Sequence, residues 1–380
     1  MERHDIAIVG AGPVGMTLAL ALKDSGLDII LLDARARGAA RHDPRVLALS
    51  HGSRLTLERL GIWARLPATA IETIHISHQG GLGRSVLRAS EYGQPALGYV
   101  VAAGDLAAAL DDAIAAAGIP VRDHATVSGL AAGVDDVLIS LDDGTHLSAR
   151  LAACAEGAIA GDDDTALVER DYGQCAVISV ATPATPHGGR AWERFTPQGP
   201  LAVLPCGRDC AIVHTASPAE ADALMALDDD AYLARLQSHF GDRLRFASVG
   251  PRACYPLKLR YRPNPVGQRT VWLGNAAQTL HPVAGQGYNL ALRDVWACAQ
   301  VLLKAGGDPG AADTLATYAR ERSLDRQGTI RFTDGLVRLF SNAVGPLLHA
   351  RGAGLLALDL IPPARHFVAK RMMFGARAWP

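Results

Sequence analysis

The chain has 380 residues, 49% of them apolar, and a formal net charge of −1 at pH 7. This length favours two domains, because single cores rarely grow beyond about 250–300 residues. The near-zero charge excludes the strongly basic field of a nucleic-acid-binding protein. Six scattered cysteines form no C-x-x-C pair, which predicts reduced thiols and no metal site.

The N-terminal residues suggest neither a secretion signal nor a membrane anchor. The charged start MERHDIAIVG leads directly into a predicted strand, without a separate apolar segment. The most apolar later stretch, residues 343–361, contains His349, Arg351 and Asp359 and is too polar for a membrane-spanning helix. We therefore expect a cytoplasmic protein.

A glycine-rich turn follows the first predicted strand, Asp5–Val9, and precedes a predicted helix and a second strand, LDIILLD. Gly10 permits the tight turn, Gly12 lets a pyrophosphate approach the backbone, and Gly15 lets the helix pack on the strand. Asp33 ends the second strand, where its carboxylate would accept hydrogen bonds from ribose hydroxyls. We expect a dinucleotide at the helix N-terminus, and this turn alone does not distinguish FAD from NAD.

The segments after this unit predict a mixture of helices and strands. Arg41–Trp63 predicts a loop and then a helix, and Arg45 within it either contacts a cofactor or is a surface cation. Asp105–Gly118 predicts a helix. The runs VLISL and THLSARL, joined by the turn Asp142–Gly144, predict a β-meander that ends in a strand before an E-G pair.

Short strands separated by proline and glycine turns dominate residues 170–260, with one predicted helix at Asp229–Phe240. The strand-like segment Ile71–Val100 is expected to join the same sheet. This sheet would interrupt the cofactor domain and form a second domain.

A second glycine-rich turn lies between a predicted strand, Val271–Leu273, and a predicted helix that starts near Asn289. A long cofactor has two ends, so a second turn beside the first would hold a ribityl chain and a ring. A helix N-terminus directed at the ring would stabilise negative charge on its reduced form. Simple NAD enzymes have no need of this element, whereas FAD enzymes do. Its glycines and proline are Gly274, Pro282, Gly285 and Gly287.

Three separated motifs resemble those of class A flavoprotein monooxygenases with the p-hydroxybenzoate hydroxylase fold. They are GAGPVG at residues 10–15, the E-G pair at residues 156–157, and GNAAQTLHPVAGQGYNLALRD at residues 274–294. The stretch NAAQTLHP is similar to the ubiquinone-biosynthesis hydroxylases within that class, of the 2-polyprenyl-6-methoxyphenol hydroxylase type. The similarity extends over nearly the whole chain.

The resemblance implies an α/β fold, with an FAD-binding Rossmann-like domain of the p-hydroxybenzoate hydroxylase type, an interleaved β-sheet substrate domain and a C-terminal helical region. The FAD-binding domain would comprise residues 1–70, 101–165 and 265–330. The substrate-binding sheet domain would comprise residues 71–100 and 166–264, and the helical region residues 331–380.

The resemblance also assigns residues to the cofactor. Arg45 matches a flavin-contacting arginine, and Asn275 takes the place of an aspartate that bonds the ribityl chain. The residues implied for the ADP half of FAD are Gly10, Gly12, Gly15 and Asp33. Those implied for the isoalloxazine ring are Pro282, Gly285, Gln286, Gly287 and Asn289, beside Gly274 in the same turn.

The middle motif departs from the family pattern A-D-G-x-x-S-x-x-R. Glu156 replaces the aspartate before Gly157, Ala160 replaces the serine, and three aspartates follow at residues 162–164. In the family this motif serves both FAD and NAD(P)H. The departure therefore affects the expected NAD(P)H contact more than flavin binding.

The implied activity is hydroxylation of a polyprenylated phenol in ubiquinone biosynthesis. NAD(P)H would reduce FAD, and O₂ would then give a flavin C4a-hydroperoxide that delivers an electrophilic oxygen to the phenol ring. The protein must exclude water and orient that ring. Pro282 and His281 are the catalytic candidates, with His281 either a base for the phenol or a turn histidine bonded to the backbone.

The C-terminal residues 313–380 predict helices whose end, PPARHFVAKRMMFGARAWP, mixes basic and apolar side chains. This end either lies on an anionic membrane surface, at the inner face of the membrane, or packs as a terminal helix with a solvated basic face. The expected partners are a polyprenylphenol-type lipid, O₂ and other ubiquinone-biosynthesis proteins. The alternatives are a flavin oxidase or dehydrogenase, a non-catalytic flavin-binding scaffold of a biosynthetic complex, and a hydroxylase of another aromatic compound.

Overall fold

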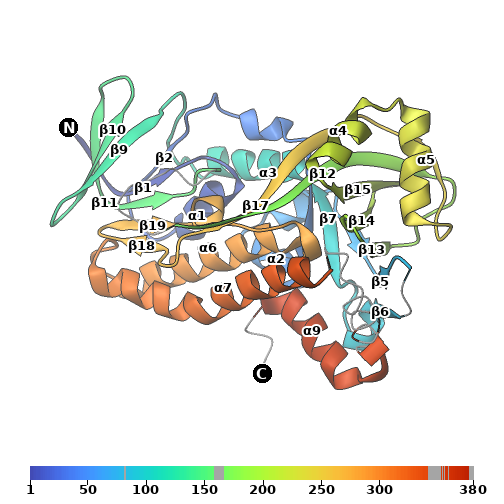
Figure 1. Cartoon of the computed structure of the whole chain (residues 1–380). Coiled ribbons are helices and arrows are strands. Elements are labelled where there is room, and N and C mark those ends of the chain that lie inside the picture. The colour runs from blue at the N-terminus through green and yellow to red at the C-terminus, as the bar shows by residue number, and fades with distance from the viewer. Residues whose placement is uncertain are drawn as a thin grey trace.

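The computed structural model describes residues 1–80, 83–157, 167–340, 352, 354, 356–357 and 359–375. Two large sheets dominate the molecule, and a long helix runs beside both of them (Figure 1). A three-stranded sheet of β3 (Val46–Ser50), β7 (Gly98–Ala102) and β4 (Thr69–Ile71) is the third sheet of the described residues.

The first large sheet has eight strands, six of which follow the order β18-β19-β11-β1-β2-β8. The central strand β1 (Glu2–Val9) is parallel to β2 (Ile29–Leu32) and to β11 (His146–Cys154). Strand β11 is in turn parallel to β19 (Thr270–Trp272). The other strands are β8 (Val121–Arg122), β9 (Val127–Ala132), β10 (Val137–Leu141) and β18 (Val266–Gly267).

Alternate residues of β1 point to opposite faces of this sheet, and different elements pack on the two faces. Ile6 and Ile8 pack in one buried cluster with α1 (Pro13–Leu22), α3 (Ala103–Ala116) and α6 (Gln286–Ala305). Ala7 packs on the other face, against β10 of the meander.

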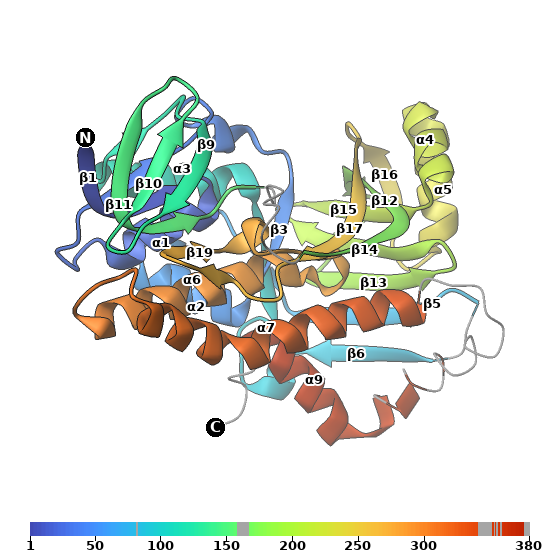
Figure 2. The same cartoon turned by 60° about the vertical axis from the view of Figure 1, so that its left-hand side comes forward.

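The second large sheet has nine strands, eight of them in the order β20-β17-β12-β15-β14-β13-β5-β6. Helices α4 (Pro218–Ala226) and α5 (Asp229–Phe240) cover one face through a buried apolar cluster. Helix α7 (Ala312–Phe340) packs against the other face (Figure 2). The strands are β5 (Thr73–His78), β6 (Arg84–Arg88), β12 (Val168–Pro183), β13 (Arg190–Thr196), β14 (Gly199–Cys206), β15 (Asp209–Ala216), β16 (Phe246–Val249), β17 (Ala253–Tyr261) and β20 (Gln278–Thr279).

The remaining elements connect and cover these sheets. Helix α2 (His51–Arg59) follows β3 directly, and α9 (Pro362–Phe374) packs on α2 and on β6. The short 3-10 helices are η1 (Ala39–His42), η2 (Trp63–Arg65), η3 (Ala89–Tyr92), η4 (Gly274–Ala276) and η5 (Val283–Gly285).

Several sequence-based expectations are confirmed and three are corrected. The helix at Asp229–Phe240 and the meander of β9, β10 and β11 are as expected. Residues 46–50 form strand β3 instead of a loop, because β7 offers them a pairing partner. Helix α4 was not expected, although Ser217 caps it and Pro218 begins it. Of Ile71–Val100, β5 and β6 join the nine-stranded sheet, whereas β7 pairs with β3 and β4.

Candidate active site

Four strand ends lie side by side at one edge of the eight-stranded sheet. Val9 is paired with both Leu32 and Cys154, and Cys154 is paired with Trp272. The first glycine turn, Asp33, the E-G pair and the second glycine turn follow these four residues in the sequence. Because the strands are parallel, all four segments leave the sheet at the same edge, where open α/β sheets bind ligands.

The first glycine turn combines two packed positions with one open position. A Cβ on Gly15 would lie 2.0 Å from the Gly10 carbonyl oxygen, and one on Gly10 would lie 2.8 Å from the Ala155 oxygen. A Cβ on Gly12 would have no atom within 4 Å. Gly10 and Gly15 therefore serve the close packing of the strands and α1, whereas Gly12 leaves the backbone open to a ligand at the start of α1.

Asp33 is buried and held by the chain itself. Its carboxylate accepts from the Ala11 backbone N–H at 2.8 Å and from the Arg35 side chain at 3.0 Å. Burial opposes ionisation, but these hydrogen bonds and the Arg35 charge lower the pKa of Asp33. It is thus an anion fixed at the end of β2, as a ribose-binding carboxylate requires.

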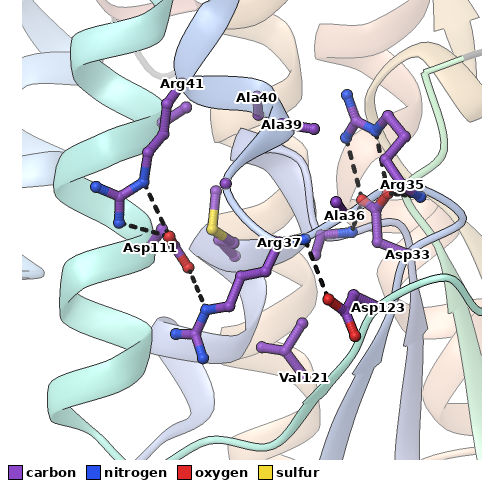
Figure 3. Close-up of a pocket in the computed structure, with 14 residues that line it drawn as sticks. Asp33, Arg35, Ala36, Arg37, Ala39, Ala40, Arg41, Asp111, Val121 and Asp123 are labelled. Atoms are coloured by element: carbon purple, nitrogen blue, oxygen red, sulfur yellow. Dashed lines mark hydrogen bonds and ion pairs between the residues drawn. The ribbon is translucent and has the colours of Figure 1, made fainter.

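A pocket opens beside Asp33, between η1 and α3 (Figure 3). Arg37 and Arg41 reach Asp111 on α3 from two sides, and Ala11 brings the first glycine turn into its lining. The pocket therefore extends from Ala11 in the first glycine turn past Asp33 to η1 and α3, a position that would suit the ADP half of FAD.

The middle motif contacts both glycine turns. Ala155 donates its backbone N–H to the Val9 oxygen at 2.7 Å. Burial and the nearby charge of Asp33 raise the pKa of Glu156. The Asn275 amide donates to the Gly157 carbonyl at 3.3 Å. Ala160 and the three aspartates at residues 162–164 lie outside the described residues.

The second glycine turn packs directly on the first helix. Gly274 has φ +58°, and a Cβ there would lie 2.9 Å from a methyl group of Val14 in α1. Asn275 follows it with an exposed side chain. The expected juxtaposition of the two turns is therefore present, although their glycines are some 260 residues apart in the sequence.

The second turn ends in two consecutive left-handed residues, Ala284 at φ +60° and Gly285 at φ +59°. The Gly285 N–H donates to the Pro282 carbonyl at 2.9 Å. This sharp reversal begins α6, where Gln286 donates to the Ala284 oxygen and a Cβ on Gly287 would meet nothing within 4 Å. The open backbone and helix N-terminus fit the ring end of a flavin, just as Gly12 fits its diphosphate.

Asn289 uses all the hydrogen-bonding capacity of its amide within the protein. Its oxygen accepts from the Ser50 N–H at 2.8 Å and the Ser53 hydroxyl at 2.6 Å. Its nitrogen donates to the Ala48 and Gly285 carbonyls at 2.8 and 2.6 Å. The side chain therefore fastens β3 and α2 to α6, and no group of the amide is left for a flavin ring.

Arg45 is paired with Asp43, through Nε at 2.9 Å and Nη2 at 2.6 Å. Its side chain is about half exposed, at 53%. The arginine is thus a surface cation with a local partner, and a contact with the flavin stays a prediction.

His281 is fully buried, and its Nδ1 accepts from the Val283 backbone N–H at 3.1 Å. Burial lowers the pKa of His281 to about 4, so the ring is neutral near pH 7 and its proton is assigned to Nε2. The Tyr172 ring packs edge to face with it, with 5.5 Å between centroids. This geometry is that of the turn histidine, one of the two readings that the sequence left open.

Gln278 lies in a buried polar network that the sequence did not reveal. Its amide donates to Asp294 of α6 at 2.7 Å and accepts from Arg326 of α7 at 2.6 Å. Tyr172, whose ring packs on His281, was likewise not expected at the site. For the network of Gln278, the sequence offered one signal, namely the charged residue Asp294 among apolar residues of the predicted helix.

Comparison with known proteins gives these features a family. The family model for an FAD binding domain matches residues 3–333. The p-nitrophenol 4-monooxygenase PnpA of Pseudomonas putida has a TM-score of 0.79, covering 99% of this chain and 100% of that one at 17% identity. HpxO of Klebsiella pneumoniae, solved with FAD and uric acid, has a TM-score of 0.75, covering 98% of each chain at 16% identity. The fold is therefore the α/β fold of the p-hydroxybenzoate hydroxylase-like flavin monooxygenases, as expected.

Similar proteins whose names state an activity identify a narrower family within the flavin monooxygenases. Ubiquinone hydroxylase UbiL of Rhodospirillum rubrum is 33% identical, over 99% of this chain and 91% of the relative. The 3-demethoxyubiquinol 3-hydroxylase of Escherichia coli is 31% identical, over 93% and 94%. The chain belongs to the ubiquinone hydroxylase family of FAD-dependent monooxygenases, which confirms the resemblance.

Proposed function

We propose that this enzyme hydroxylates the ring of a polyprenylated phenol in ubiquinone biosynthesis, with NAD(P)H as reductant and O₂ as oxygen donor. The observation that carries the proposal is similarity over 99% of the chain to a ubiquinone hydroxylase. The meeting of both glycine turns at one sheet edge supports it, because a cofactor as long as FAD needs two such turns.

Bound FAD supplies the electrons that activate O₂. The start of α1 and Gly12 would hold the diphosphate, and Asp33 would accept from the ribose. The turn from Pro282 to Gly287 would face the ring. His281 keeps this turn in shape through the Val283 N–H and, being neutral, adds no charge beside the substrate.

We further propose that the substrate ring lies between the second turn and the nine-stranded sheet, which gives residues 71–100 and 166–264 their role as a substrate domain. The apolar cluster of Phe195, Val283, Val337 and Phe340 supports this placement, because it joins sheet, turn and α7 and excludes water there.

The test is complementation of strains that each lack one ring hydroxylase, with quinone intermediates identified by mass. The purified FAD-loaded enzyme should also oxidise NADH or NADPH faster when a methoxyphenol is added, and should place ¹⁸O from O₂ in the product. Failure in every strain, with no stimulated oxidation, would instead support a non-catalytic flavin-binding scaffold.

We propose a peripheral membrane contact at the C-terminal helices, where the lipid substrate dissolves. Leu360, Ile361 and Phe367 are 69%, 51% and 47% exposed there. Within the described residues no helix has the length and apolar character needed to cross a bilayer. Flotation with anionic liposomes, for the wild type and for a variant with Leu360, Ile361 and Phe367 changed to serine, tests the contact, and equal flotation of both proteins would contradict it.

A further inference from the structure

One row of side chains on the nine-stranded sheet is only partly buried. It lies on the face opposite α4 and α5 and crosses five neighbouring strands. Each member is the cross-strand partner of the next, in the order Ile178 of β12, Val213 of β15, Ala202 of β14, Glu193 of β13 and Ile76 of β5. The residues next to them that point to α4 and α5 are fully buried, namely Val177, Ile212, Val203 and Trp192. The contrast shows that protein atoms cover this face of the row less completely than α4 and α5 cover the other face.

Glu193 is the ionisable member of this otherwise apolar row. Although part of the side chain is accessible, its Oε1 atom is buried and has no hydrogen-bond partner among the residues that the structure describes. Burial is the cause that raises the pKa of Glu193 to about 7, and no cation offsets it. A buried carboxyl oxygen without a partner is costly, so its presence in a folded protein points to a partner that arrives from outside.

The position of Glu193 connects it to the second glycine turn. Phe195 lies two residues further along β13 on the same face, and Ile76 is the partner of Glu193 on β5. Both pack in one cluster with Val283, whose N–H bonds to His281. The carboxyl group therefore borders the region that the turn and its helix leave open for the flavin ring.

The chemistry of the row specifies its ligand. Small or branched apolar side chains offer a flat aromatic ring a dry surface, and one unpaired acceptor calls for one hydroxyl donor. Resting on the function proposed above, we infer that Glu193 binds the hydroxyl group of the phenolic substrate and acts as its base. The phenol O–H bond breaks, an Oε–H bond forms, and the electron pair stays on the phenolate oxygen. The ring thereby becomes richer in electrons for attack by electrophilic oxygen, and the carboxyl proton later leaves to water.

Two other titratable groups of this region, Tyr172 and His281, do not fill the role. Burial raises the pKa of Tyr172 well above its ordinary value, and its hydroxyl already donates to Asp334 at 3.1 Å. His281 accepts from the backbone and is neutral above about pH 4. Among the described residues, the titratable side chains nearby on this face include His78 on β5, Tyr172 on β12, Cys206 on β14, Tyr255 on β17, Asp334 on α7 and His281 before η5.

The test uses the FAD-loaded enzyme with two probes, 2-methoxyphenol and its methyl ether 1,2-dimethoxybenzene. Dissociation constants are measured by calorimetry between pH 5.5 and 8.5 for the wild type, Glu193→Gln and Glu220→Gln. Glu220 lies on α4, across the sheet, and pairs with Arg235, so it is the matched control. The wild type and the control should bind the phenol about tenfold tighter as the pH rises through 7, because a carboxylate accepts more strongly than a carboxylic acid. Glu193→Gln should show no such change, and the ether should show none with any protein.

Rates separate this inference from the proposed function. Glu193→Gln should lower the rate of phenol hydroxylation about 10²–10⁴-fold and leave flavin reduction by NAD(P)H unchanged, and Glu193→Asp should recover part of the loss. Full hydroxylation by Glu193→Gln, or a pH-dependent phenol affinity in that variant, overturns the inference alone. A wild type that hydroxylates no phenol overturns the proposed function and this inference with it.

Discussion

Gly12 and Gly15 differ in what a side chain would meet, and this difference separates folding from cofactor binding. A Cβ at Gly15 would overlap the Gly10 carbonyl, whereas one at Gly12 has free space. Gly15→Ala should destabilise the protein by about 3 kcal/mol or more in urea unfolding. Gly12→Ala should change stability by less than about 0.5 kcal/mol and weaken FAD binding about tenfold, measured by flavin fluorescence. Equal loss of stability in both variants would contradict this assignment.

Glu193 should make the stability of the enzyme depend on pH. Its pKa rises from 4.5 to about 7 on folding, so the folded state binds the proton more tightly. The stability it contributes is therefore present below about pH 4.5 and lost as the pH rises through 7. At pH 8 the free energy of unfolding of Glu193→Gln should exceed that of the wild type by about 1–3 kcal/mol, measured by urea unfolding. At pH 4.5 the two proteins should differ little. A difference that does not vary with pH would contradict the buried carboxyl group.

His281 should be replaceable by a residue that keeps its one backbone hydrogen bond. An asparagine oxygen can accept an N–H two residues ahead, as His281 Nδ1 does from Val283. His281→Asn should therefore retain FAD affinity and keep hydroxylation within about tenfold of the wild type. A loss of about 10²-fold or more, with unchanged flavin reduction, would make His281 the base instead.

At the residue scale, the sequence predicted backbone roles better than side-chain roles. Gly12 and Asp33 lie where the glycine pattern placed them, because that pattern follows from local turn geometry. Asn289 and Glu193 could not be assigned in this way. Asn289 bonds to Ser50, and Glu193 lies beside Ala202 of the neighbouring strand. Ser50 is far from Asn289 in the sequence, and the environment of Glu193 forms only when the sheet assembles, so both roles depend on tertiary packing.

Helices α6 and α7 are joined by buried charges as well as by apolar contacts. Arg322 of α7 donates to Asp294 of α6 at 2.7 Å and to Asp325 at 2.7 Å. Burial alone would raise the pKa of Asp325, but Arg293 and Arg322 hold it at about 2. The network also includes Gln278 of the second glycine turn, so it fixes that turn to both helices.

Arg322→Met should destabilise the protein strongly, because it leaves the carboxylates of Asp294 and Asp325 buried without this cation. The expected loss is about 3–5 kcal/mol in urea unfolding. Arg235→Met breaks an exposed pair with Glu220 and should cost less than about 1 kcal/mol. Equal losses in the two variants would show that the buried network carries no special weight.

At the element scale, the strongest periodic or compositional signals predicted the correct structure. The helix at residues 229–240 and the meander had clear patterns and local turns. Strand β3 lacked such a signal, since its residues take an extended form only because β7 and β4 build a small sheet beside them. Helix α4 had a signal that was overlooked, namely the Ser217 cap followed by Pro218.

FAD should stabilise the two large sheets together. Its proposed site uses residues near Gly12, Gly157 and Gly287, which lie in three distant parts of the sequence. Val283 connects this site to the nine-stranded sheet. At a hundredfold excess over its dissociation constant, FAD should add about 2.7 kcal/mol to the unfolding free energy. Calorimetry should show one transition that moves up as a whole, and a shift of only part of it would contradict this coupling.

At the scale of the whole molecule, composition and motifs predicted the fold class but not the strand order. Strand β11 lies between β1 and β19, and β20 of the second turn pairs with β17 of the other sheet. The first pairings join segments more than a hundred residues apart, and in the second case the chain passes from the eight-stranded sheet at β19 to the nine-stranded sheet at β20. No local pattern encodes them, and the resemblance supplied the architecture instead.

The pairing of β19 on the far side of β11 also bears on how the chain matures at the ribosome. The first glycine turn leaves the ribosome early. The edge of the eight-stranded sheet at which this turn lies lacks β19 and the second turn until residues 270–287 have emerged. A nascent chain of about 260 residues would thus hold only half of a flavin cradle. Flavin capture should be among the last events of synthesis, and chains halted before that point would be released without cofactor.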